Sequence, residues 1–304
     1  MISNKQPFDW VPTPELIASS NLTAFLRKVG EPRFEDLATR ADADPAWLMQ
    51  EVFEFCDFRF FKPYTQMLDT SRGIEWGRWC VGGTTNIVLN CLDRHRDTPV
   101  WDQTFLVWEG EDPKNRKSLS YGEFDAEVCR LAGALQSLGI GRGDRVGLYL
   151  PNLPETFVAF FAVLKIGAVL MPLFSGFGPQ PIVARLNDGE AKAVLTVDGT
   201  WRRGTPGVMK SVLDEALREV PSVQHVVVLR HLGEASPCPM TPGRDHDWAS
   251  LVAGHPHDMP TAEMEADAPA VLLYTSGTTG KPKGCVWTHV SFLGSMVTRD
   301  MHIC

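Results

Sequence analysis

The sequence predicts an α/β protein in which layered, mostly parallel sheets are flanked by helices, with an irregular helical extension at the N-terminus. The main observation is that short apolar runs alternate with amphipathic segments between residues 144 and 229. Strands covered on both faces by helices are typically continuous apolar runs. Two further observations are a helix with clear start and stop signals before this region, and a buried strand that leads into a glycine-rich loop after it.

The helix before the alternating region is predicted from its ends and its spacing. Ser120 and Glu123 have capping-box spacing, in which both side chains satisfy free N–H groups at a helix start. Gly139 is placed as the stop. Apolar residues recur between these ends at helical spacing, at Phe124, Val128, Leu131, Leu135 and Leu138. We expect a structural role for this helix.

The alternating elements follow in chain order. Strands are expected at residues 146–150, 169–173, 193–197, 225–229 and 270–274. Helices are expected from Pro154 to the stop at Gly167, over residues 182–187, and over 208–219 before Pro221. Residues 157–174 are nearly long enough to span a bilayer, but Lys165, Gly167 and Pro172 interrupt the run and favour a buried helix followed by a strand.

The rest of the chain lacks this regularity. Residues 1–110 contain helical fragments and many aromatic residues, and we expect an extension packed on the α/β body of residues 111–304. Residues 230–267, rich in Pro, His, Gly and acidic side chains, are expected to form an exposed excursion.

Composition narrows the possible partners and the compartment. A formal net charge of −8 argues against nucleic acid or an anionic membrane as the main partner. Seven scattered cysteines with no CxxC pair favour a reducing cytoplasm over a disulfide framework or a zinc site. The first residues contain no apolar run of the kind found in signal peptides. We therefore expect a cytoplasmic protein that acts on small molecules; the oligomeric state cannot be predicted.

The strongest chemical signal is the loop after residues 270–274. Its glycines allow backbone N–H groups to approach oxygen atoms closely, and its hydroxyl and lysine side chains add donors and positive charge. The predicted phosphate-binding residues are Thr275, Ser276, Gly277, Thr278, Thr279, Gly280, Lys281 and Lys283. The loop is not a Walker A motif, because Gly277 and Gly280 are too close together and Pro282 follows Lys281.

Other candidate sites are weaker. The segments 255–257 and 245–247 contain His and Asp, but they lie in a polar, proline-rich stretch without matching cysteines, so we expect solvated loops and no metal site. Ser276 lacks the GxSxG context of a hydrolase nucleophile. Cys285 has no basic neighbour placed to activate it and is expected to be buried and inert.

The loop YTSGTTGKPKG, residues 274–284, resembles the signature loop of the AMP-forming acyl-CoA synthetases, a superfamily that includes luciferases and peptide-synthetase adenylation domains. Residues 79–95, WCVGGTTNIVLNCLDRH, resemble a segment near the start of acetyl-CoA and propionyl-CoA synthetases. Further similarity lies at GDRVG (143–147), PNLPE (151–155) and FSGFG (174–178). The resemblance implies the N-terminal part of an adenylate-forming enzyme.

The resemblance implies an ATP-dependent carboxylate–CoA ligase that uses ATP, Mg²⁺ and CoA. The carboxylate would attack the α-phosphate of ATP, and the CoA thiol would then displace AMP from the acyl-adenylate. Thr275 to Lys283 would hold the β- and γ-phosphates, with Lys283 as a phosphate stabiliser. Arg202 and Arg203 correspond roughly to a basic element that contacts CoA phosphates, although Thr205 stands where a second arginine is usual.

Several alternatives stay open at this point. Arg202 and Arg203 are equally well explained as solvated loop residues, and Gly176, expected beside the CoA channel, as part of a structural turn. The family's adenine-binding, magnesium-binding and hinge segments and its mobile C-terminal domain come after this point in the family, so we expect a chain that is inactive alone. A non-catalytic nucleotide- or CoA-binding fragment, an adenylation enzyme of another branch and an unrelated P-loop ATPase are the alternatives.

Overall fold

A computed structural model gives the structure of residues 11–236, 238–275 and 282–303. The chain divides into two compact units: residues 1–58, 66–79 and 293–304 form the first, and residues 59–65 and 80–292 the second. The boundary that we place near residue 110 stays a prediction. No helix in the described ranges is both long and apolar enough to cross a bilayer.

The first unit is helical, as expected for the N-terminal residues. Each of its first two helices begins at a side-chain cap, Thr13 for one and Ser20 for the next. Phe25 is fully buried and its ring meets Phe55 edge to face. The helices are α1 Pro14–Ser19, α2 Asn21–Val29, α3 Phe34–Ala43 and α4 Pro45–Phe55. They are followed by the short strand β1 Gln66–Asp69, which pairs with β2 Arg78–Val81; only the first two residues of β2 belong to this unit.

The second unit is built on a seven-stranded sheet with the order β12-β11-β8-β6-β7-β14-β15. All neighbouring strands are parallel except β15, which runs antiparallel to β14. The sheet confirms the predicted fold class and five predicted strands. The strands are β6 Arg145–Tyr149, β7 Val169–Pro172, β8 Ala193–Val197, β11 His225–Leu229, β12 Asp245–Asp247, β14 Pro269–Tyr274 and β15 Gly284–Thr288.

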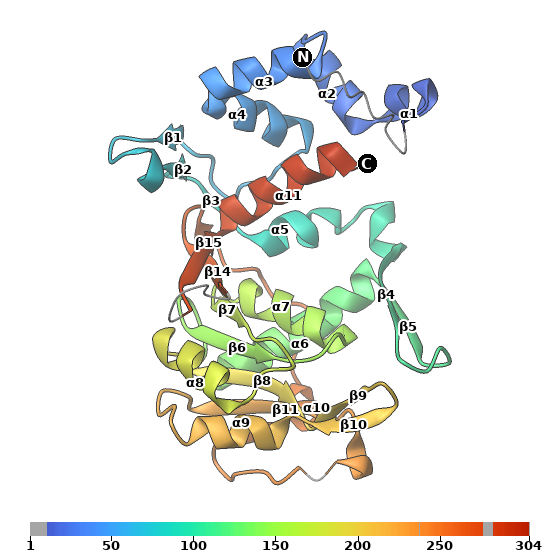
Figure 1. Cartoon of the computed structure of the whole chain (residues 1–304), viewed down its shortest axis with the longest axis vertical. Coiled ribbons are helices and arrows are strands. Elements are labelled where there is room, and N and C mark those ends of the chain that lie inside the picture. The colour runs from blue at the N-terminus through green and yellow to red at the C-terminus, as the bar shows by residue number, and fades with distance from the viewer. Residues whose placement is uncertain (1–10, 237, 276–281, 304) are drawn as a thin grey trace, which may run out of the picture. The chain divides into compact units, whose positions relative to one another are not determined.

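Helices cover both faces of this sheet (Figure 1). The chain moves from β6 to β7 in one direction along the sheet and returns across β6 to β8 and β11 in the other. Because such crossovers are almost always right-handed, helices that connect strands in opposite directions lie on opposite faces. Helix packing agrees: α6 Tyr121–Ser137 packs on α7 Pro154–Lys165 and α10 Trp248–Val252, whereas α8 Pro179–Asp188 packs on α9 Lys210–Leu217.

The predicted helix signals are confirmed where they are strongest. Ser120 and Glu123 form both hydrogen bonds of the capping box at the start of α6. Gly139, with φ of 75°, follows that helix, and Gly167, with φ of 74°, follows α7. The segment 157–174, which resembles a membrane span in length, is the buried helix α7 followed by the buried strand β7.

The expectation of an exposed excursion over residues 230–267 is wrong in part. Asp245–Asp247 is the edge strand β12, not a solvated loop, and the Asp245 side chain is completely buried. Its carboxylate pairs with the buried Lys210 of α9 at 2.7 Å and with Arg244 at 2.6 Å. The sequence misleads here because a short polar strand has weak β-propensity, and its stability comes from partners distant in sequence.

The remaining elements of the second unit are short. α11 His289–Ile303 begins in this unit, and its residues from Leu293 belong to the first. Two short strands, β3 Thr84–Thr85 and β13 Met264–Glu265, pair antiparallel. The others are α5 Ile87–Cys91 and two hairpins that matter for the site, β4 Thr104–Glu109 with β5 Arg116–Ser120 and β9 Gly199–Arg202 with β10 Thr205–Val208.

Candidate functional site

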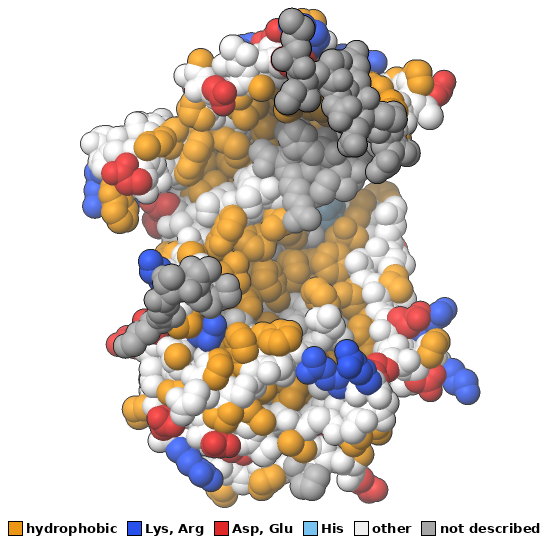
Figure 2. All heavy atoms as spheres, viewed as in Figure 1, with side chains coloured by type: hydrophobic (Ala, Val, Ile, Leu, Met, Phe, Trp, Pro, Cys, Tyr) orange, Lys and Arg blue, Asp and Glu red, His pale blue; other side chains and the backbone are white. Residues whose placement is uncertain are grey.

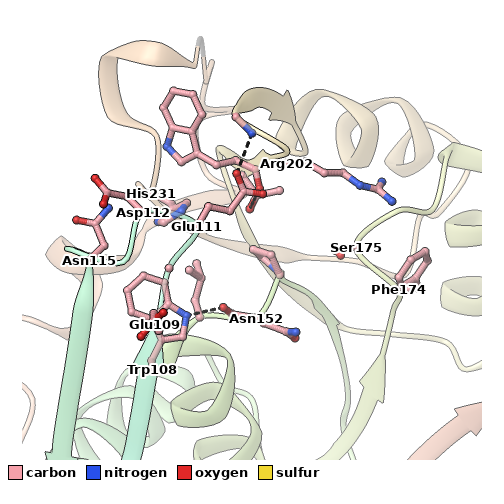
Figure 3. Close-up of a pocket in the computed structure, with 16 residues that line it drawn as sticks. Trp108, Glu109, Glu111, Asp112, Asn115, Asn152, Phe174, Ser175, Arg202 and His231 are labelled. Atoms are coloured by element: carbon pink, nitrogen blue, oxygen red, sulfur yellow. Dashed lines mark hydrogen bonds between the residues drawn. The ribbon is translucent and has the colours of Figure 1, made fainter.

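A cavity of about 900 Å³ lies at the carboxyl edge of the parallel strands in the second unit (Figure 3). Its walls come from the segments that follow β6, β7, β8 and β11 and from the loop between β4 and β5. The lining residues are Trp108, Glu109, Gly110, Glu111, Asp112, Asn115, Pro151, Asn152, Leu153, Phe174, Ser175, Thr200, Trp201, Arg202, Gly204 and His231. A cavity of this volume is large enough for a nucleotide-sized ligand.

The position of the cavity follows from the strand order. The connections that leave β6 and β8, which are neighbours in the sheet, run in opposite directions. In open α/β sheets, a crevice forms outside the carboxyl ends of two such strands, and ligands bind there. Three segments that the sequence analysis marked separately, 151–155, 174–178 and 200–204, all contribute to this crevice.

Asp198, directly after β8, organises two of the loops at the crevice. The carboxylate is almost fully buried and accepts hydrogen bonds from the backbone N–H groups of Gly199 at 2.7 Å and His231 at 2.9 Å. It also accepts hydrogen bonds from the backbone N–H groups of Leu232 and Gly233. A buried carboxylate is tolerated when its oxygens are satisfied in this way. Asp198 therefore joins the end of β8 to the end of β11.

The predicted CoA arginines lie on the β9–β10 hairpin and not on an irregular loop. Thr205 pairs with Arg202, so the turn contains only Arg203 and Gly204. Their φ angles of 53° and 74° are those of a type I′ turn. Arg202 lines the cavity, and its guanidinium makes no hydrogen bond or ion pair with the described part of the chain. In Figure 3 its side chain extends from the hairpin in the direction of Ser175 and Phe174.

The side chain of Glu111 bridges the β4–β5 loop and the turn of the β9–β10 hairpin. Its carboxylate accepts the N–H of Arg203 at 2.7 Å and the N–H of Gly204 at 2.9 Å. These two hydrogen bonds, first that of Gly204, lower the pKa of Glu111 below its usual value, because they favour the ionised form. The carboxylate is therefore charged at neutral pH.

Aromatic side chains form much of the remaining wall. Trp108 lines the cavity and donates its indole N–H to the carbonyl of Asn152 at 2.8 Å, which attaches β4 to the segment after β6. Trp201 and Phe174 are both partly exposed at the cavity. The predicted residue Gly176 follows the lining residue Ser175 and is exposed, but it is not part of the wall.

The described ends of the predicted phosphate loop lie at the same edge of the sheet. β14 is parallel to β7, so its carboxyl end, with Thr275, is on the cavity's edge. Thr275 donates its N–H to the carbonyl of Lys283 at 3.1 Å, so the two strands of the β14–β15 hairpin stay paired at the base of the loop. Both residues are exposed. Ser276, Gly277, Thr278, Thr279, Gly280 and Lys281 lie outside the described residues.

Tyr274 anchors the base of this loop. Its hydroxyl donates to Asp188 of α8 at 2.7 Å. Partial burial, together with Asp188, raises the pKa of Tyr274, because both disfavour the phenolate. The other end is less enclosed: Cys285, expected to be buried, is exposed on the edge strand β15.

Lys and Arg side chains lie at several places on the face drawn in Figure 2. A compact group of Lys and Arg lies beside hydrophobic surface over the strands labelled β8 and β9 in Figure 1. The described residues contain no group of three His, Cys, Asp or Glu that is arranged to hold a metal ion. The cavity itself is lined by three carboxylates, those of Glu109, Glu111 and Asp112, and by one arginine, Arg202, beside its aromatic wall.

Sequence reasoning missed three residues of the site. Trp108 and Glu111 fall near the end of the expected extension, where no motif marks them. Asn152 lies in the segment 151–155, which carries a family resemblance but no predicted role. The cavity forms only when the β4–β5 hairpin folds against the ends of distant strands, so no local pattern predicts these three.

Comparison with known proteins agrees with this geometry. The family profile "AMP-binding enzyme" matches residues 92–303, which is most of the chain. The chain belongs to the AMP-binding enzyme family. A second profile, "Acetyl-coenzyme A synthetase N-terminus", matches residues 34–91. The family membership predicted from the loop and from residues 79–95 is confirmed.

Curated relatives of this AMP-binding enzyme include acetyl-coenzyme A synthetases of Syntrophus aciditrophicus, 43% identical over 80% of the chain, and of Chlorobaculum tepidum, 35% identical over 96%. A solved structure, acetoacetyl-CoA synthetase from Streptomyces lividans, covers 95% of the chain with a TM-score of 0.86 and 27% identity. The chain spans 37% and 42% of the length of the two relatives and 44% of the solved chain.

Proposed function

We propose that the chain is the part of an ATP-dependent carboxylate–CoA ligase, AMP- and pyrophosphate-forming, that binds the nucleotide portion of CoA and the phosphates of ATP. The observation that carries the proposal is the convergence of residues 151–155, 174–178 and 200–204 at one cavity on the carboxyl edge of the sheet. The phosphate loop begins at that same edge. Relatives named acetyl-coenzyme A synthetase favour a short-chain carboxylate as substrate.

The residues have separate roles in this proposal. The guanidinium of Arg202 attracts a CoA phosphate, while Trp108, Trp201 and Phe174 offer flat surfaces to the adenine ring. Gly176, next to the cavity residue Ser175, would lie beside the bound CoA. Thr275 and Lys283, with the loop between them, hold the β- and γ-phosphates of ATP.

In the first reaction, a carboxylate oxygen attacks the α-phosphorus of ATP, and the bond to the β-phosphate breaks to release pyrophosphate. The CoA thiol then loses its proton, forms a bond to the acyl carbon and releases AMP. Mg²⁺ would arrive with ATP. Because the described residues contain no metal-holding cluster, we assign no magnesium ligand to this chain.

We further propose that this chain binds ligands without catalysing the complete reaction. The support is its length, which is about two fifths of that of the curated relatives. We also propose a cytoplasmic location, since the seven cysteines are scattered along the sequence with no CxxC pair. A carboxylate-dependent ATP–pyrophosphate exchange assay, with a full-length relative as positive control, is expected to give no exchange for this chain. Clear exchange would contradict the proposal of binding alone.

Binding is tested by calorimetry with CoA and with ATP. Arg202→Ala is expected to weaken CoA binding about tenfold, because it removes a charge-assisted contact, and to leave ATP binding unchanged. Lys283→Ala is expected to weaken ATP binding and to leave CoA binding unchanged. Arg218→Ala and Lys62→Ala, which remove exposed charges outside the cavity, serve as matched controls. Equal effects of Arg202→Ala and Arg218→Ala on CoA binding would refute the assignment.

A further inference from the structure

The contact between Glu111 and the β9–β10 turn places a carboxylate where an anionic ligand group would bind. Consecutive residues with positive φ turn their N–H groups toward one side and form an anion-binding concavity. Here the two N–H groups of Arg203 and Gly204 point at the Glu111 carboxylate, which accepts both. Arg202, the residue before the turn, lines the same cavity.

We propose that Glu111 is an internal competitor for a ligand phosphate. Without ligand, its carboxylate occupies the Arg203–Gly204 turn and joins the tips of the β4–β5 and β9–β10 hairpins, both of which line the cavity. A ligand phosphate that reaches the turn takes over the two N–H groups, and the β4–β5 tip is released. This proposal rests on the proposed function, which supplies CoA as the phosphate-bearing ligand.

The charges around the turn support displacement over simple coexistence. A ligand phosphate cannot accept hydrogen bonds from the same N–H groups while Glu111 accepts them. The negative charges of the phosphate and of the Glu111 carboxylate would also repel each other at one turn. The exchange is feasible because Glu111, Arg203 and Gly204 are all exposed, so the released carboxylate is immediately hydrated. Glu109, on the same hairpin, differs in that its carboxylate pairs with Arg116 at 2.8 Å.

The test compares CoA affinity among matched variants by calorimetry. Glu111→Ala removes the competitor and is expected to tighten CoA binding about threefold to tenfold, and Glu111→Gln, which retains an acceptor but no charge, by a smaller factor. Glu109→Gln removes a negative charge near the cavity without freeing the turn, so it reports the general electrostatic effect. Equal gains for Glu111→Ala and Glu109→Gln would overturn the proposal.

A second measurement follows the backbone directly. In ¹⁵N-labelled protein, the amide resonances of Arg203 and Gly204 are expected to shift in Glu111→Ala, and to shift in the wild type when inorganic pyrophosphate or CoA is added. If CoA binds neither form, the proposed CoA site fails, while pyrophosphate still tests the competitor. Amides that respond to neither the Glu111 variants nor pyrophosphate would overturn the inference about Glu111 by itself.

Discussion

His289 shows how one buried residue makes the stability of the protein depend on pH. Its side chain is fully buried at the start of α11, and its Nδ1 accepts the N–H of Ile87 at 3.2 Å. The proton of the neutral ring therefore lies on Nε2, which has no partner among the described atoms. Burial, with a smaller effect of Arg142, lowers the pKa of His289 to about 4.

We predict that stability falls as pH decreases from about 6.5 to about 4. In this window the unfolded chain binds a proton at His289 and the folded protein does not, so protonation favours unfolding. The full effect is ~3 kcal/mol, from a pKa lowered from 6.5 to about 4. Urea unfolding at pH 7.0, 5.5 and 4.5 measures this slope.

The comparison with His289→Asn isolates this residue from other groups. Asn retains an acceptor for the Ile87 N–H but does not titrate, so the variant is expected to have a shallower slope. His257→Gln, at an exposed position, is expected to keep the wild-type slope. If His289→Asn and the wild type lose stability equally between pH 7.0 and 4.5, His289 is not responsible.

At the scale of elements, ion pairs of a buried carboxylate, and not apolar side chains, hold the edge strand β12 on the sheet. This strand has three residues, all polar, and pairs only with β11. Burial by itself would raise the pKa of Asp245, but hydrogen bonds from Arg244, Lys210 and the N–H of Thr241 outweigh it and lower that pKa. Lys210 in turn is completely buried and pairs with Asp214 of its own helix at 2.7 Å.

Asp245→Asn is expected to destabilise the protein by about 3 kcal/mol, because it leaves the charge of buried Lys210 only partly compensated. Hydrogen exchange of the β12 amides should accelerate more than that of β6 in the centre of the sheet. In the wild type, the contribution of Asp245 is present above pH ~4 and decreases as pH falls below that value. A matched control is Asp258→Asn, whose carboxylate is 73% exposed and pairs with Arg96; it should cost under about 1 kcal/mol. Similar costs for the two variants would contradict this account.

At the scale of the second unit, one buried lysine joins segments that are far apart in the sequence. Lys165, at the end of α7, is completely buried and its Nζ lies 3.2 Å from Asp93, 3.4 Å from Asp125 and 3.0 Å from the hydroxyl of Thr261. Burial raises the pKa of Asp125, although Lys165 and Arg96 oppose this. The network thus connects α6, α7, the 3-10 helix Asp93–His95 and the loop that contains Thr261.

Lys165→Met is expected to cost about 3–5 kcal/mol, since it leaves the buried Asp125 carboxylate with Arg96 as its remaining charged partner and removes a charged partner of Asp93. Adding Asp125→Asn should recover part of this loss, because the two residues are coupled. Lys117→Met, at a half-exposed pair with Glu155, should change stability by less than about 1 kcal/mol. Urea unfolding followed by tryptophan fluorescence compares the wild type, Lys165→Met, Asp125→Asn, the double variant and Lys117→Met; additive effects of the two single changes would argue against the network.

The sequence alone determined the α/β class, five strands of the main sheet, the capped helix α6 and the family, because each depends on residues close together in the chain. Apolar runs, a capping box and the YTSGTTGKPKG loop are local signals. Only the tertiary structure revealed the polar strand β12, the hairpin that carries Arg202, and the cavity with Trp108 and Glu111. These features arise from pairing between distant segments: a buried Lys210 stabilises β12, and the reversal of direction between β6 and β8 opens the crevice. Periodicity reports which residues are buried, but only the folded chain determines which of them meet.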